Sequence, residues 1–177
     1  MKKYELTAEF IEKWGKKLFR IKALISFGSV EAGELGGYIE KEDNLAHDGN
    51  AWVYGDAEVC GNARVYGDAE VCGDAEVCGN ARVYGNARVY GNADYLLIGR
   101  IGSRFSFTTF FKNKDKGITV SCGCFLGTIA EFRAKVTDTH GNNKHAKMYN
   151  LAADMAELQI LGEEYFDKLN TNKSEPF

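Results

Sequence analysis

A short basic, glycine-rich motif has the residue types and spacing of a possible binding site. Gly99-Arg100-Ile101-Gly102-Ser103-Arg104 places two glycines, two guanidinium groups and a hydroxyl within six residues. Glycine lets backbone N–H groups approach an anion, and arginine binds phosphate through paired hydrogen bonds. The Lys-Ser/Thr ending of a nucleotide-binding P-loop is missing. The motif indicates an anion site that uses Arg100, Ser103 and Arg104, or else a turn that simply leaves the preceding repeat.

Four side chains of metal-ligating type lie further along the chain. Cys122 and Cys124 share one side of a predicted strand, and His140 and His145 flank a Gly-Asn-Asn break between two predicted helices. Two thiolates and two imidazoles are zinc ligands, and a thiol beside a histidine base is also a nucleophile. The spacing matches no standard zinc motif. We expect these residues to be structural, with no resident metal and no cofactor, and keep zinc binding and a nucleophilic cysteine as alternatives.

A six-residue repeat occupies the middle of the chain and must position these groups. A phrase of the form Ala-(Glu/Arg)-Val-(Tyr/Cys)-Gly-(Asn/Asp) is repeated seven times between Ala51 and Asp94, with Trp52 at the second position of the first copy. In an extended segment Ala and Val point to the same side, and Gly with Asn or Asp tolerates the positive φ of a sharp turn. Three of these six-residue segments make one coil of eighteen residues. Val53, Val71 and Val89 are then stacked about 4.8 Å apart. The pattern predicts a parallel β-helix, with an array of twisted hairpins as the alternative.

The repeat and the segment before it resemble a known family. The chain is similar to the start of left-handed β-helix proteins of the bacterial predicted-transferase type at Phe27-Gly28-Ser29-Val30, Gly36-Gly37-Tyr38-Ile39, Asn44-Leu45 and Trp52-Val53-Tyr54. Short versions with the same repeat and a similar tail resemble phage and prophage proteins described as polymer-forming or hypothetical. The resemblance implies a left-handed parallel β-helix of hexapeptide repeats and a phage accessory protein. One departure is that Tyr or Cys follows the repeat valine, where acyltransferases usually carry Gly, Ala, Asp or Glu.

Acyl transfer is the enzymatic function that this resemblance raises. Hexapeptide-repeat acyltransferases stretch coenzyme A along several coils and use a histidine near a subunit interface as a general base. His47, just before the repeat, is the candidate for that role, and the seven hexads make only about two and a third coils. No loop with a histidine interrupts them. We therefore expect His47 to be a structural side chain, and keep an acyl-CoA-dependent transferase as the alternative function.

Three segments follow from the pattern: an N-terminal cap over 1–50, the repeat over 51–94, and a ββαα unit over 95–177. The cap is physically needed, because an uncovered β-helix end exposes unpaired backbone groups that template aggregation. Within it, Tyr4–Leu6 and Leu18–Ala23 alternate like strands. The predicted fold class is mainly β, with a short parallel β-helix and an α+β tail.

The tail is predicted to hold a hairpin and two helices. The hairpin consists of Phe105–Phe111 and Ile118–Cys124. A capping box at Thr128 opens the first helix, which stops at Gly141, and the second helix runs over about 144–169. Large apolar residues recur at helical spacing along this second helix, at Met148, Leu151, Met155, Leu158 and Tyr165.

Steps of eighteen residues also place outward side chains in columns. The predicted columns are Arg64-Arg82-Arg100, Glu58-Glu76-Asp94, Glu70-Arg88 and Tyr66-Tyr84. Like charges stacked at strand spacing repel, so a charged column needs an opposite charge nearby. One solution is a neighbouring subunit in a closed ring, most simply a trimer, with the tyrosines as an apolar anchor. The others are an anionic ligand on the arginines and a solvated surface.

Composition and charge limit the partners and the cellular location that we expect. The formal charge of −3 is too small to argue for nucleic acid, and no apolar run is long enough to span a membrane. No signal-peptide pattern follows Met1, and three of the five cysteines alternate with tyrosine in the repeat, which indicates reduced thiols in a cytoplasmic protein. We expect a non-enzymatic, oligomeric phage or prophage protein. It would bind a host factor or a small nucleotide-like anion, as a counter-defence sponge.

Overall fold

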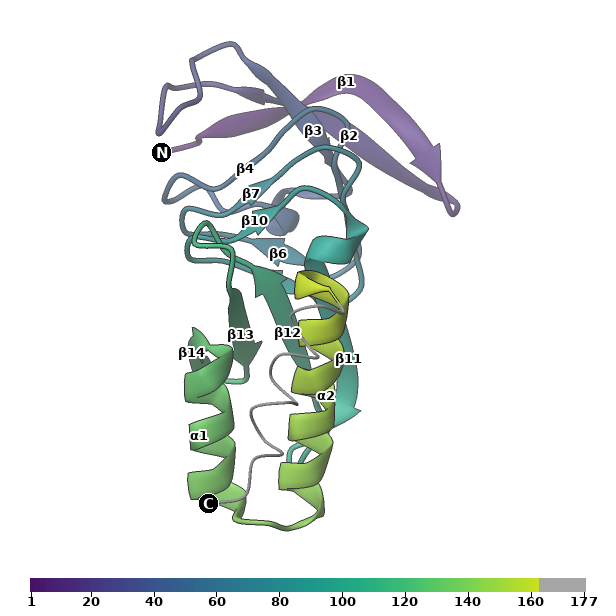
Figure 1. Ribbon diagram of the computed structural model, residues 1–177. Helices are drawn as coiled ribbons and strands as arrows, with labels where there is room; N and C mark the ends of the chain where they lie inside the picture. The colour runs from purple at the N-terminus through teal and green to yellow at the C-terminus, as the bar shows by residue number, and fades with distance from the viewer. Residues whose placement is uncertain (163–177) are drawn as a thin grey trace. The chain divides into compact units, whose positions relative to one another are not determined.

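The computed structural model describes residues 1–162 and divides the chain into two compact units, Met1–Asn92 and Ala93–Phe177. The first unit holds the hexapeptide repeat and the second holds a four-stranded sheet with two helices (Figure 1). No helix within residues 1–162 is long and apolar enough to cross a membrane.

The hexads fold into a β-solenoid. Each one contributes a two-residue strand, and the seven strands are β4 (Trp52–Val53), β5 (Glu58–Val59), β6 (Arg64–Val65), β7 (Glu70–Val71), β8 (Glu76–Val77), β9 (Arg82–Val83) and β10 (Arg88–Val89). They pair in parallel at steps of eighteen residues, β4 with β7 and β7 with β10 (Figure 1), and likewise β5 with β8 and β6 with β9. The hairpin array is excluded, because its neighbouring strands would be antiparallel.

Valine and alanine fill the interior of the coils, as the alternation predicted. Val53 pairs with Val71 and Val71 with Val89, and every repeat Val and Ala is 0% exposed. The corners turn at glycines with positive φ, from Gly49 at 67° to Gly85 at 70°. Because each coil stacks directly on the next, the apolar faces that a single hexad cannot bury are covered by its neighbours.

The N-terminal segment contains the cap and also an additional coil. β1 (Tyr4–Lys13) and β2 (Lys16–Ala23) form an antiparallel hairpin, and β2 pairs with β3 (Leu35–Ile39). β3 then pairs in parallel with β5, so this stretch is already a rung of the solenoid. The steps here are twenty residues, Ile39 to Val59 and Leu45 to Val65, with a short 3-10 turn at η1 (Glu42–Asn44). The two extra residues break the hexad spacing, which is why the sequence assigned the whole of 1–50 to a cap.

Two of the charged columns find opposite charges inside the chain. Lys13, at the tip of the cap hairpin, pairs with Glu58 at 2.8 Å and also with Glu76, and Arg88 pairs with Glu70 at 2.8 Å. The expected third members of the columns are not on the solenoid, since Asp94 and Arg100 belong to the second unit. The electrostatic requirement that suggested a facing subunit is therefore met for the acidic column by Lys13.

The repeat cysteines correct one expectation. Cys60 and Cys78 lie on consecutive coils with their Cα atoms 4.7 Å apart, and they form a disulfide. Reduced thiols were predicted at these positions. The step of eighteen residues places the same repeat position of two coils side by side, which brings the two sulfur atoms together.

The second unit begins within a 3-10 turn, η2 (Asn92–Asp94). Its sheet has the order β11 (Tyr95–Ile101), β12 (Ser106–Lys112), β13 (Ile118–Cys122) and β14 (Phe125–Thr128), all antiparallel. The predicted hairpin corresponds to β12 and β13. The flanking strands β11 and β14 were not predicted, because the basic motif was assigned to a turn and β14 has only four residues.

Two helices follow the sheet. α1 (Ile129–His140) begins at the Thr128–Glu131 capping box and ends before Gly141, as predicted. α2 (Lys144–Leu161) begins where it was predicted to begin but ends at the C-cap Gly162, before the predicted end near residue 169. The expected positions beyond residue 162, Tyr165 included, lie outside the described residues.

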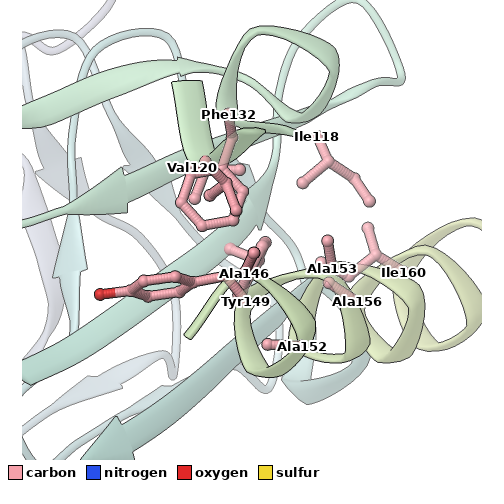
Figure 2. Packing of buried hydrophobic residues seen from close by; sticks show 11 residues of the cluster. Ile118, Val120, Phe132, Ala146, Tyr149, Ala152, Ala153, Ala156 and Ile160 are labelled. Carbon is pink, nitrogen blue, oxygen red and sulfur yellow. The ribbon is translucent and has the colours of Figure 1, made fainter. Parts of the chain in front are cut away.

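The face of α2 that packs differs from the one that the large apolar residues suggested. The buried residues of this helix are mostly small, and Figure 2 shows them directed at the sheet and α1: Ala146, Tyr149, Ala152, Ala153, Ala156 and Ile160. Small side chains let the helix backbone come close to Val120 and Phe132. The larger Met and Leu side chains are left on the outside.

Candidate anion-binding pocket

A pocket of about 210 Å³ lies within the second unit. The β11–β12 turn, the β13–β14 turn and the two helices enclose it. Its lining residues are Ser103, Arg104, Ser106, Cys122, Gly123, Cys124, Phe125, Phe132, Lys135, Val136, Thr139, His140 and Tyr149.

Gly102 places the β11–β12 turn against α2. Its φ is +72°, and a Cβ at this position would overlap the ring and hydroxyl of Tyr149. The backbone N–H of Phe105 donates to the carbonyl of Gly102 at 3.4 Å and closes the turn. Glycine is required both for the positive φ and for the close approach. The residues that follow it, Ser103 and Arg104, are thereby held at the mouth of the pocket.

The β13–β14 turn forms a second wall. Cys122 pairs with Phe125 across this turn, and Gly123 has a φ of +62°. A guanidinium nitrogen of Arg104 is the nearest group to the space beside Gly123, 3.6 Å from the position that a Cβ would take. The Arg104 guanidinium therefore reaches across from one turn to the other.

The lining has an asymmetric charge. Arg104, Lys135 and His140 are basic or become so on protonation, and none of the thirteen lining residues is Asp or Glu. Lys135 also pairs with Asp138 at 3.1 Å, outside the pocket on the same helix. The remaining walls are apolar, with Phe125 and Phe132 in tilted contact at 5.6 Å between ring centres. Such a site favours a ligand with an anionic group and a flat apolar part.

Cys122 is the centre of a small polar network in the pocket. The Thr108 hydroxyl donates to its sulfur at 3.2 Å, and the Tyr149 hydroxyl is also hydrogen-bonded to it. Burial, and then the proximity of Cys122, raise the pKa of Tyr149 to about 12. Tyr149 is therefore protonated at neutral pH and acts as a donor. Two hydroxyl groups, rather than a histidine base, are the hydrogen-bond partners of this thiol.

The structure brings together five of the residues that the sequence singled out. Ser103, Arg104, Cys122, Cys124 and His140 all line the pocket. Zinc binding was kept only as an alternative, and no group of three or more His, Cys, Asp or Glu side chains within residues 1–162 could hold an ion.

The other predicted ligand residues lie elsewhere. Arg100 is exposed on β11 and does not line the pocket, while His145 stands beside His140 with 5.8 Å between ring centres. The residues that the sequence missed are Lys135 and Tyr149. Lys135 could have been found, because it lies three residues after Phe132 on the first helix, and residues at this spacing are neighbours on a helix surface.

The arginine pair of the solenoid has a different setting. Arg64 and Arg82 are register partners on β6 and β9, beside Tyr66 and Tyr84, whose rings stack at 4.5 Å as predicted. They border a separate hollow of about 540 Å³ in the first unit whose lining also includes Glu42, Asp43 and Asp48. This mixed charge makes it a poorer anion site than the pocket of the second unit.

His47 has a structural environment. Its Nδ1 accepts a hydrogen bond from the backbone N–H of Lys3 at 3.2 Å, and its ring stacks on Tyr4 at 4.4 Å between ring centres. Nε2 lies 3.8 Å from a carboxylate oxygen of Glu42. Both nitrogens are thus close to groups of the same chain, which agrees with a structural side chain in this coil.

Comparison with known protein families identifies the repeat. The model of the YdcK beta solenoid repeat matches residues 57–73 and 75–91, which form two nearly complete coils. The chain is a β-solenoid repeat protein. The match covers about a fifth of its length and lies entirely within the first unit. No curated protein matches the chain.

Proposed function

We propose that this protein binds a small organic anion in the pocket of its second unit and does not transform it chemically. The observation that carries the proposal is the lining itself, which combines Arg104, Lys135 and His140 with no acidic residue. An arginine and a lysine in a cavity whose lining has no carboxylate favour a negatively charged ligand, although Lys135 also pairs with Asp138, which lies outside the lining.

The chemistry of the walls narrows the class of ligand. Phe125 and Phe132 offer aromatic surface opposite the basic groups, which suits a ring attached to a phosphate or carboxylate. The pocket of about 210 Å³ is smaller than the roughly 300–1,000 Å³ usual for drug-sized ligands. A nucleotide-like anion would therefore insert one part, and the rest would lie in solvent at the exposed Ser103–Arg104 turn.

A binding function fits the polar groups better than an enzymatic one. A nucleophilic cysteine is activated by an adjacent base, whereas Thr108 and Tyr149 are the partners of Cys122. An acyltransferase needs a histidine that is available to substrate, whereas His47 is stacked and hydrogen-bonded. In both places the candidate group already has hydrogen-bond partners within the chain.

The resemblance seen in the sequence supports two finer proposals about the solenoid and its source. The coils are left-handed, in the manner of hexapeptide-repeat proteins, and the protein is a phage or prophage accessory that captures a host-derived anion. An experimental structure would decide the hand of the coils. Mass spectrometry of the purified protein, under native and then denaturing conditions, would identify an anion retained from the cell.

Titration calorimetry tests the binding proposal. We would titrate inorganic phosphate, AMP, cyclic mononucleotides and acetyl-CoA into the full chain and into Arg104→Ala. Loss of a charge-assisted hydrogen bond should weaken binding by about 10- to 100-fold. Arg100→Ala is the matched control, because this arginine lies four residues away, is exposed and does not line the pocket.

Two results would contradict the proposal. Equal losses in the two arginine variants would mean that the basic segment attracts anions without a defined site. Consumption of acetyl-CoA that disappears in His47→Ala would establish the enzymatic alternative. A change of Arg104 should not lower the melting temperature, since its side chain is exposed.

A further inference from the structure

α2 carries a second apolar face that the rest of residues 93–162 leaves exposed. Met148, Leu151, Met155 and Leu158 are 39%, 63%, 57% and 45% exposed. Their spacing of three, four and three residues is that of consecutive a and d positions in a heptad repeat. We call these four residues the α2 seam.

The packing of α2 explains why the seam stays exposed. The helix already buries a continuous face of small residues against the sheet and α1, from Ala146 to Ile160 (Figure 2). A helix that packs only against its own core needs one apolar stripe. A stripe limited to the a and d positions of a heptad is narrower than that, and it is the surface through which helices form coiled coils. α2 therefore has one face for its own unit and one suited to another helix.

The charges along α2 favour a second copy of the same helix in the opposite direction. Lys144 and Lys147 lie in its first turn, where the partial positive charge of the helix dipole opposes them, and its first turn contains no acid. Its last turn contains no base, so the partial negative charge at that end is also uncompensated by its own side chains. Asp154 and Glu157, in the second half, are held by Arg133 at 2.7 Å.

An antiparallel pair of α2 helices removes both mismatches. The lysines at the start of each helix would lie beside the carboxyl-terminal end of the other, where cations are stabilising. In the same arrangement Leu151 faces Met155 of the second copy, and Met148 faces Leu158. Apolar side chains then meet in every layer of the seam.

From these observations we infer that α2 is a homodimerisation helix that pairs antiparallel with α2 of a second copy through the α2 seam. The seam is smaller than the roughly 800 Å² per partner of a standard interface, so we expect a dimer of micromolar affinity. The inference is independent of anion binding, because none of the seam residues lines the pocket.

Sedimentation equilibrium of the full chain across the micromolar range provides the first test. We expect a species of twice 19.6 kDa. Leu151→Lys and Met155→Glu should each weaken the dimer by about 30-fold or more, since each buries a charge at the centre of the seam. Leu126→Lys is the matched control, because Leu126 is 44% exposed on β14, away from the seam, and its replacement should leave the dimer intact.

Mixing the two seam variants then tests the direction of the helices. In an antiparallel pair the lysine introduced at position 151 meets the glutamate introduced at position 155, so the mixture should dimerise although neither variant does alone. In a parallel pair these positions do not face each other, and the mixture would stay monomeric. Far-UV circular dichroism of each variant verifies that α2 is folded.

Three outcomes would overturn the inference. A monomeric wild-type protein throughout the concentration range would mean that the seam does not pair with a second copy. Equal weakening by Leu126→Lys would place the contact elsewhere. Failure of the mixed variants to associate would exclude the antiparallel arrangement.

Discussion

Lys13 joins the cap hairpin to the acidic side of the solenoid, so its replacement tests how the charges of the coils are balanced. Its Nζ lies 2.8 Å from a carboxylate oxygen of Glu58 and pairs also with Glu76, which is the register partner of Glu58 on the next coil. The three side chains are partly buried: Lys13 is 31% exposed, Glu58 12% and Glu76 33%. Lys13→Ala would leave two carboxylates one strand spacing apart, about 5 Å.

The size of the effect follows from this geometry. Two like charges 5 Å apart repel by about 3 kcal/mol at an effective dielectric constant of 20, and by about 0.8 kcal/mol in bulk water. This repulsion is present with and without Lys13, so Lys13→Ala costs only the two attractions that offset it, roughly 1 kcal/mol each at this partly buried site. We expect the free energy of unfolding of the first unit to fall by about 2 kcal/mol. Lys16→Ala is the control, because Lys16 pairs with Glu40 at a more exposed site and should cost about 0.5 kcal/mol.

Urea unfolding followed by tryptophan fluorescence measures this difference. Both tryptophans, Trp14 and Trp52, belong to the first unit, so the signal reports that unit alone. Hydrogen bonds to Glu58 and Glu76 raise the pKa of Lys13. The folded pKa is above the unfolded one, so the stabilisation is present below about pH 10.5 and disappears as the pH rises through the folded value.

Two results would refute this reasoning for Lys13. The first is an equal loss of stability in Lys13→Ala and Lys16→Ala. The second is an undiminished effect of Lys13→Ala in a Glu76→Gln background, where only one carboxylate remains to be neutralised. High salt should also reduce the effect, because the pair is partly exposed to solvent.

Three further predictions concern the first unit. Gly49→Ala should lower the urea midpoint more than Gly55→Ala: both have positive φ, but only at Gly49 would a Cβ meet a backbone carbonyl, at 2.5 Å. Val71→Asp should abolish the β signal in circular dichroism by burying a charge, whereas Tyr84→Ser should preserve it. Burial lowers the pKa of Lys3 to about 8 from 10.5, so between pH 8 and 10.5 the unfolded state binds more protons than the folded state. The urea midpoint of the wild type should therefore rise from pH 8 to 10.5, whereas that of Lys3→Met should not.

The sequence alone determined the features of this protein that depend on neighbouring residues. Alternation of Ala and Val fixes which side of each edge is buried, and Gly followed by Asn or Asp fixes where the chain turns, so the eighteen-residue coil and its columns follow from spacing. The same holds for the start of α1 at Thr128, where the capping box is complete within four residues. The basic motif at 99–104 identified Ser103 and Arg104, but could not exclude Arg100.

Only the tertiary structure decided features that join distant parts of the chain. The additional coil before the repeat was hidden by two extra residues, and Lys13 reaches carboxylates more than forty positions away. The sequence could not determine which face of α2 packs against the sheet, because both of its faces are apolar. Helical periodicity shows that a face is apolar but does not show what it contacts. The pocket likewise exists because Gly102 lets one turn lie against Tyr149, which brings together residues from two turns and two helices that no local pattern connects.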